Sequence, residues 1–153
     1  MAAAALVAPG VAVDYPQDFP SLKGRPTPAR LAGLAGAMRG YDLVCTYNWG
    51  AMDAVMAHRT YARALGLPPL VHHEDGFNED EAVRLDPKRN IYRRAALGRA
   101  AALVVPSTGL ETIAREVWRQ PARRSRSERE RFWQDPAPVS AAQPCHRPRS
   151  ASV

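Results

Sequence analysis

The sequence has 153 residues, a hydrophobic fraction of 46% and a formal net charge of +6. This length and composition are typical of one globular domain. The chain is neither too short nor too polar to bury a hydrophobic core. The positive charge is concentrated toward the end, because residues 1–121 carry a net charge of +2 and residues 122–153 carry +4. The folded part is therefore not strongly basic, and we rank nucleic-acid binding below the other candidate functions.

The cysteines and the apolar runs bear on location. Cys45 lies in a predicted core strand and Cys145 near the end, so no disulfide framework is expected and a reducing cytoplasm is the simplest interpretation. The longest uncharged apolar stretch, residues 1–13, falls short of the roughly 20 residues of a membrane span and lacks a signal peptide's positive region. We expect a cytoplasmic protein, and peripheral contact with the inner face of the membrane is compatible with that location.

Near the N-terminus, Val11, Val13 and Tyr15 alternate with small or polar residues, which predicts a short strand. Thr27 followed by a proline is a helix start, and an apolar stripe at helical spacing continues from there to a stop at Gly40.

The residues that follow predict one strand–helix–strand unit. Residues 42–47 (DLVCTY) are rich in strand formers, and residues 51–65 carry apolar side chains near helical spacing. Gly66 and two prolines end the helix before a second strand, residues 70–73 (LVHH). A unit of this length predicts parallel pairing and a right-handed crossover.

The second half continues the alternation. Residues 78–88 predict a loop or a surface helix, residues 90–100 a helix with Arg93, Arg94 and Arg99, and residues 101–105 a buried strand. These arginines could attract phosphate, but a solvated helix face is the commoner explanation. Ser107 and Thr108 begin a further amphipathic helix, and Thr108 and Glu111 have the spacing of a capping box. The whole predicts a Rossmann-like α/β domain over residues 1–121, with a parallel sheet of about four strands flanked by helices.

Residues 122–153 differ sharply in composition. They contain seven Arg and four Pro but no Leu and no Ile, so we expect a disordered tail. The change follows a helix directly, where an α/β fold should supply its next strand. A frameshift in a GC-rich coding sequence would produce such a composition.

Three polar turns follow the predicted strands, and the carboxyl edge of a parallel sheet is where ligands bind. They are Asn48-Trp49-Gly50, Glu74-Asp75-Gly76 and Ser107-Thr108. Asn48 could bond an acceptor hydroxyl or cap a helix. Trp49 could stack on a sugar or simply pack. Glu74 and Asp75 could bind an acceptor, act as a base or be merely solvated, whereas Gly76 serves backbone geometry.

Two histidines precede these acids, which raises the question of a metal site. Strand alternation places His72 with Glu74 on one face and His73 with Asp75 on the other. Each face then offers only two ligands, so we expect no metal.

Several segments together resemble the N-terminal domain of GT-B glycosyltransferases of the retaining, family-4 type. The matching pieces are DLVCTYN, residues 42–48, the turn ending at Gly76, the basic helix of residues 92–100, LVVPS, residues 103–107, and the helix of residues 110–118. The resemblance covers residues 11–121, and it rests on the order and spacing of these pieces. The family often has a histidine after the glutamate of the second turn, where this sequence has Asp75.

The resemblance implies hexosyl transfer from a nucleotide sugar to a saccharide or lipid-linked acceptor, without a cofactor or metal. By this resemblance Asp75 is the catalytic residue. The residues implied to bind the acceptor are Asn48, Trp49, Gly50, His73, Glu74, Gly76 and Ser107. The chain corresponds to the acceptor-side domain, shortened at both ends and without the second GT-B domain, so we expect no transfer by it alone. The alternative is a non-catalytic fragment or binding module.

Overall fold

The structure is a computed structural model that describes residues 7–77, 81, 84–121 and 125–127. It is an α/β fold with a parallel sheet, as the sequence predicts, and its four strands stand in the order β1-β2-β3-β4. Only the first three are strands that the sequence predicts, because the fourth lies beyond the predicted domain of residues 1–121. The strands are β1 (Val44–Tyr47), β2 (Leu70–His73), β3 (Ala102–Val105) and β4 (Ser125–Ser127). The α-helices are α1 (Pro28–Ala37), α2 (Met52–Leu65), α3 (Pro87–Ala96) and α4 (Thr108–Glu116). Short 3₁₀ helices are η2 (Met38–Gly40), η3 (Trp49–Ala51) and η5 (Leu97–Arg99).

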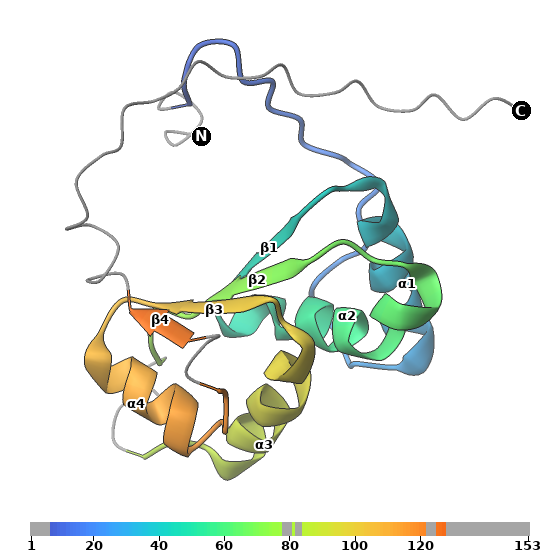
Figure 1. Ribbon diagram of the computed structural model, residues 1–153. Helices are drawn as coiled ribbons and strands as arrows, with labels where there is room; N and C mark the ends of the chain where they lie inside the picture. The colour runs from blue at the N-terminus through green and yellow to red at the C-terminus, as the bar shows by residue number, and fades with distance from the viewer. Residues whose placement is uncertain (1–6, 78–80, 82–83, 122–124, 128–153) are drawn as a thin grey trace, which may run out of the picture.

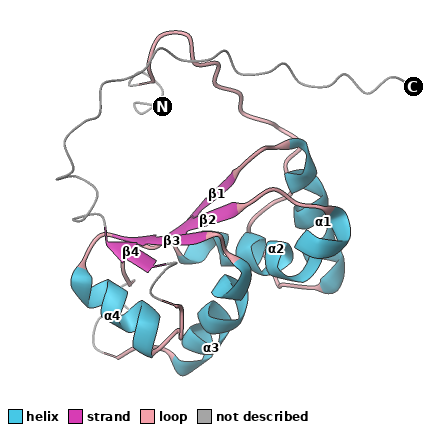
Figure 2. Cartoon of the chain, in the orientation of Figure 1, coloured by secondary structure: helices cyan, strands magenta, loops and turns pink. Residues whose placement is uncertain are grey.

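The helices α1 to α4 lie on the same side of the sheet (Figures 1 and 2). The register agrees with this arrangement, because Thr46, His72 and Leu103 are aligned across three strands and all are buried. The next residues along β1, Cys45 and Tyr47, point to the opposite face and are exposed. In the described part of the chain, the sheet therefore has one covered face and one open face.

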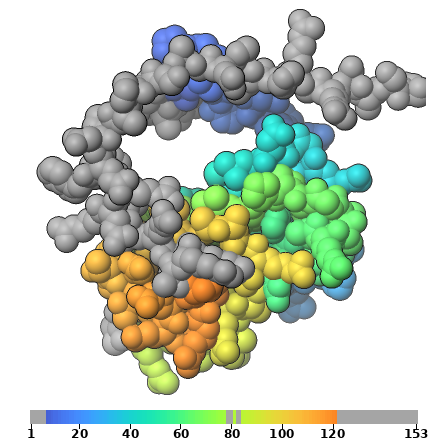
Figure 3. All heavy atoms as spheres, in the orientation of Figure 1, coloured from blue at the N-terminus to red at the C-terminus, as the bar shows by residue number. Residues whose placement is uncertain are grey.

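The core lies between the covered face of the sheet and the helices. One cluster joins α2, α3 and α4 to the strands, and the second joins α1 to α2 beside β1. Figure 3 shows the cyan and green region packed against the yellow and orange region as one body. The largest apolar side chains with almost no exposed surface are Trp118, Leu34, Met38, Met52, Leu70, Leu97 and Leu103.

The helix ends follow from local sequence. Thr27 caps α1 by accepting a hydrogen bond from the Arg30 N–H, and Gly66 ends α2 in the left-handed conformation, both as predicted. The predicted capping box at Thr108 is wrong. Ser107 is the cap of α4, since its hydroxyl accepts a hydrogen bond from the Leu110 N–H at 3.2 Å.

Two predictions about β structure are also wrong. Residues 11–15 form no strand and are exposed, because alternation alone supplies no hydrogen-bonding partner and no described strand pairs with them. Cys45 is not a core residue, since it lies on the open face of an edge strand. Alternation predicts two faces but does not say which of them a helix covers.

The short strand β4 departs from the expected disorder of residues 122–153. It pairs in parallel with β3 over Leu103–Val105 and so occupies the position where an α/β fold places its next strand. Backbone pairing needs no apolar side chain, which is why the composition gave no signal for it. The rest of the predicted tail, residues 122–124 and 128–153, lies outside the described residues.

No helix within the described ranges is both long enough and apolar enough to cross a membrane.

Candidate functional site

The first two polar turns meet at the carboxyl edge of the sheet. The backbone N–H of Asp75 donates to Asn48 Oδ1 at 2.8 Å, and the backbone N–H of Asn48 donates to the carbonyl of His73 at 2.8 Å. Because β1 and β2 are parallel neighbours, residues that follow each strand come together across 27 positions of sequence. Two of the three polar turns therefore lie together at this edge of the sheet.

A cavity of about 170 Å³, which we call the edge pocket, lies between these turns. It combines two carboxylates, a carboxamide, two aromatic rings and a guanidinium. Its lining residues are Asn48, Trp49, Glu74, Asp75, Gly76, Phe77 and Arg93.

Glu74 is the buried acid of the edge pocket, with no exposed surface. Its Oε2 lies 3.5 Å from His72 Nε2 and 3.5 Å from Arg93 Nε. Its Oε1 accepts no hydrogen bond from any residue that the structure describes. A buried carboxylate oxygen costs free energy unless it accepts a hydrogen bond, so this atom favours a ligand hydroxyl or water.

Arg93 is the central cation of the site, and the prediction that it lies on a solvated face is wrong. The side chain is fully buried, and its two terminal nitrogens donate to both carboxylate oxygens of Glu81 at 3.1 Å. Its guanidinium lies 4.9 Å from the ring centre of Trp49 and 5.2 Å from the ring centres of Phe77 and Trp118. The neighbouring Arg94 and Arg99 are exposed, as predicted.

A sequence signal for this arrangement existed. Arg93 lies between Asn90 and Leu97 on one helical stripe, where Leu97 is buried and Asn90 accepts a hydrogen bond from the Trp118 indole at 2.9 Å. Glu81, in the acidic segment before α3, supplies the counter-charge.

Glu81 is held as a carboxylate by its surroundings. Burial acts to raise its pKa, but hydrogen bonds from Arg93, Arg89 and the Asp86 backbone N–H outweigh burial and set the pKa below its ordinary value of 4.5. The Arg93–Glu81 pair therefore stays charged near neutral pH and holds the start of α3 against the edge pocket.

The histidines separate onto the two faces of β2, as alternation predicts. His72 is buried, and its Nδ1 lies 2.9 Å from the Thr46 hydroxyl. On the open face, His73 Nε2 lies 2.9 Å from Asp75 Oδ1, and its ring meets that of Tyr47 edge-on. The Asp75 side chain is 42% exposed, so it can reach a ligand at the mouth of the edge pocket. Within the described ranges, no three His, Cys, Asp or Glu side chains are grouped closely enough to hold a metal ion.

For Asn48 the interpretation as a helix cap is wrong, whereas for Trp49 the structure shows the packed arrangement. The side chain of Asn48 caps no helix, and its backbone has a φ of 54° and a ψ of −178°, a conformation that is costly for any residue except glycine. Trp49 is packed, with Tyr92 edge-on at 5.9 Å and Arg89 at 5.3 Å from its ring centre.

The remaining predicted residues lie at or near the same edge. Gly76 lines the edge pocket with a φ of 154°, which favours glycine there. Ser107 does not line the edge pocket, because its hydroxyl is used to cap α4.

A second cavity, which we call the basic pocket, lies on the other side of Trp49 and has a volume of about 490 Å³. Gly50, a predicted acceptor-binding residue, lines this cavity instead of the edge pocket. The residues that line the basic pocket are Leu22, Lys23, Gly24, Pro26, Trp49, Gly50, Met52, Asp53, Lys88, Arg89 and Tyr92.

The chain was compared with known proteins at the levels of family, sequence and fold. No protein-family model matches it, and no curated protein or solved structure matches it either.

Proposed function

We propose that this chain is the acceptor-binding portion of a GT-B glycosyltransferase, with the edge pocket as the site that holds the acceptor saccharide. The observation that carries the proposal is the edge pocket itself, where Glu74 presents a buried carboxylate oxygen without a hydrogen-bond partner among the described residues. A saccharide hydroxyl is the kind of group that satisfies such an atom.

The other lining groups support a sugar ligand. Asp75 supplies a second carboxylate, and the Trp49 and Phe77 rings supply apolar surface of the kind on which the C–H face of a sugar packs. A pocket of about 170 Å³ suits one sugar ring and not a nucleotide sugar.

In this proposal Asp75 accepts the proton of the attacking hydroxyl. The acceptor oxygen forms a bond to C1 of the donor sugar while the bond between C1 and the diphosphate oxygen breaks, and the nucleoside diphosphate leaves with the bonding electron pair. Arg93 keeps Glu74 and Trp49 in place from behind the pocket, since it contacts both. In GT-B enzymes a second domain supplies most contacts with the nucleotide sugar, so the acceptor half of the reaction is assigned to these residues.

Saturation-transfer-difference NMR on the full chain with neutral saccharides and nucleotide sugars tests the proposal. We expect a saccharide to bind and nucleotide sugars not to displace it, because they belong to a different site. Asp75→Asn should weaken binding about tenfold, as expected for a hydrogen bond to a charged group. Asp42→Asn is the matched control, since Asp42 is exposed before β1 and lines neither pocket. If no saccharide binds, or if a nucleotide sugar competes for the pocket, the proposal is wrong.

A further inference from the structure

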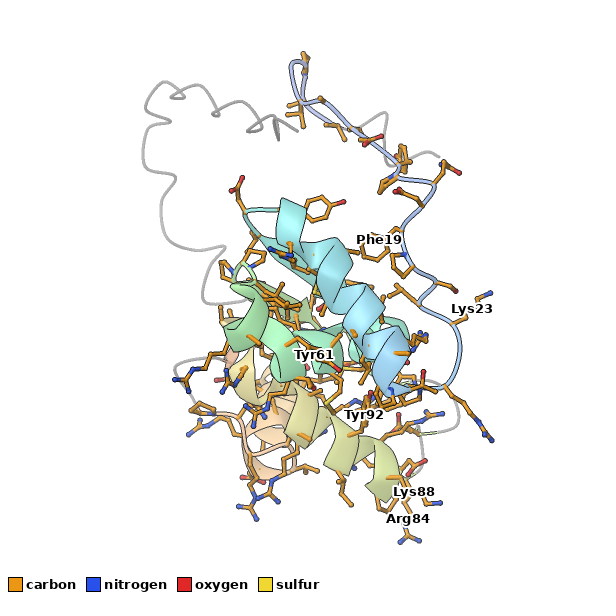
Figure 4. All side chains as sticks on the ribbon, turned by 90° about the vertical axis from the view of Figure 1, so that its right-hand side faces the viewer. Phe19, Lys23, Tyr61, Arg84, Lys88 and Tyr92 are labelled. Carbon is orange, nitrogen blue, oxygen red and sulfur yellow. The ribbon has the colours of Figure 1, made fainter. Side chains whose placement is uncertain are left out.

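In the lining of the basic pocket, cationic side chains outnumber acidic ones. Lys23, Lys88 and Arg89 line it together with one carboxylate, that of Asp53. Figure 4 views the molecule from this side and shows Lys23 on the segment before α1 and Lys88 at the start of α3. Neither lysine ammonium group forms an ion pair or a hydrogen bond with a residue in the described part of the chain.

Asp53 does not neutralise these lysines, because both of its oxygens are already used. Oδ2 pairs with the Arg30 guanidinium, and Oδ1 accepts a hydrogen bond from the Tyr92 hydroxyl at 2.7 Å. Burial first, and then this bond to Asp53, raise the pKa of Tyr92, so the phenol stays protonated and remains the donor. The acid thus has its own cation, and among the described residues the two lysines have no counter-charge.

The wall between the two pockets is Trp49, which lines both of them. The Arg89 guanidinium lies over its ring at 5.3 Å, and Arg89 also pairs with Glu81 at 3.1 Å. Gly50, next to Trp49, has no atom within 4 Å of the position where a Cβ would stand. Gly50 therefore leaves open space beside the Trp49 ring.

We propose that the basic pocket binds the phosphate group of the acceptor, so that the acceptor is a phosphate-bearing saccharide whose sugar lies in the edge pocket. This inference rests on the proposed function and narrows its substrate class. Lys23 and Lys88 both line the pocket and offer charged hydrogen-bond donors to a phosphate there. The apolar residues Leu22, Pro26 and Met52 then face the part of the ligand beyond the phosphate.

The sequence makes this pocket directly observable, because Lys23 and Lys88 are the only two lysines of the chain. Reductive methylation with ¹³C-formaldehyde labels both lysines and the α-amino group while preserving their charge. The label thus gives NMR signals from the basic pocket and one internal reference signal. On titration with glucose 1-phosphate, we expect both lysine signals to shift and saturate while the reference stays still. Glucose should move neither lysine signal.

Two variants keep the test specific. Gly50→Leu places a side chain in the pocket, retains both lysines and should abolish the saturable shift. Lys88→Gln, read from the Lys23 signal, should weaken binding about tenfold, the effect expected when one charged hydrogen-bond partner is lost. Arg63→Gln is the control for charge, because Arg63 is exposed in the last turn of α2 and lines neither pocket. The control should bind like the unaltered chain.

Two further titrations distinguish the source of the phosphate. If the acceptor is lipid-linked, vesicles of phosphatidylcholine containing phosphatidylglycerol should broaden both lysine signals, and phosphatidylcholine vesicles should not. If the acceptor is a free sugar phosphate, only glucose 1-phosphate should act. Lysine signals that stay unmoved by every phosphate compound, or that move equally with sodium chloride at matched ionic strength, would overturn the inference.

Failure of this inference is distinguishable from failure of the proposed function. Neutral saccharides that bind in the edge pocket while the lysines ignore phosphate would contradict the phosphate site alone. Lysine signals that respond to inorganic phosphate, without any saccharide binding, would retain the anion site and contradict the glycosyltransferase proposal.

Discussion

At the scale of single residues, Arg93 maintains the shape of the edge pocket. It is buried between two carboxylates, those of Glu81 and Glu74, and among the rings of Trp49, Phe77 and Trp118. A buried ion pair contributes little net stability when intact, but removal of one partner leaves the other charge buried without compensation. The residue therefore couples α3 to both acids and to the pocket wall.

Arg93→Met should lower the free energy of unfolding by about 3–5 kcal/mol, since it leaves Glu81 and Glu74 without their shared cation. Urea denaturation followed by circular dichroism measures the change. Arg94→Met is the matched control, because Arg94 is exposed on the same helix and should change stability by less than about 0.5 kcal/mol. Equal effects of the two substitutions would show that Arg93 is not the buried cation described here.

Glu81 gives the fold a defined response to acid. Its pKa in the folded chain lies below the ordinary value of 4.5, so its stabilising contribution is complete above that pH and is lost as the pH falls through the folded pKa. Urea midpoints measured from neutral pH downward should therefore decline below about 4.5. In Glu81→Gln this part of the decline in the urea midpoint should disappear. If the arginines did not hold the Glu81 carboxylate, the substitution would leave the dependence of the urea midpoint on pH unchanged.

At the scale of elements, the joint between β1 and α2 supports the carboxyl edge. Asn48 leaves β1 in a conformation that suits glycine, and its carboxamide accepts the Asp75 N–H. The strain, on the order of 1–3 kcal/mol, opposes a hydrogen bond worth about 1 kcal/mol. A strained asparagine at this place is consistent with a role at the edge pocket and not with a role in stability.

Substitution of Asn48 separates these two effects. Asn48→Ala keeps the strain and loses the hydrogen bond, whereas Asn48→Gly loses the bond but relieves the strain. We expect the glycine variant to be more stable than the alanine variant by about 1–2 kcal/mol. Thermal unfolding measures both, and an alanine variant as stable as the glycine variant would contradict the backbone conformation of Asn48.

The sequence predicts most elements, and its failures have physical causes. Local signals such as the Thr27 cap and the left-handed Gly66 lie within one helix turn, and both were predicted. The stripe shared with Asn90 and Leu97 hints that Arg93 is buried, but the aromatic rings that surround it come from other elements and lie far away in the sequence. The exposure of Cys45 depends on which face the helices cover. The meeting of Asn48 and Asp75 was predictable because parallel pairing alone requires it.

At the scale of the whole molecule, the open face of the sheet is the main exposed apolar surface near β1. Tyr47 is 52% exposed there, and Leu43 at the entry to β1 is 51% exposed. Residues 43–47 contain no charged residue and no proline, which are the usual protections of an edge strand. We therefore expect the chain to associate with a second copy of itself through this strand and face.

Tyr47→Lys should reduce that association, because it places a charge at the centre of the apolar surface. Sedimentation velocity over a range of concentrations measures the shift from dimer to monomer. Ile91→Lys is the control, since Ile91 is 69% exposed on α3 in the helical layer and the substitution adds the same charge. A chain that remains monomeric at every concentration would exclude association through the open face.

The most direct test of the acceptor site is a ¹⁵N-HSQC titration of the full chain with the saccharide that binds most tightly in the saturation-transfer experiment. We expect the amide signals of Asn48, Asp75 and Gly76 to shift together and to saturate at one dissociation constant, because these residues line one pocket. Shifts confined to other parts of the chain, or no saturable shift at all, would contradict the assignment of the edge pocket as an acceptor site.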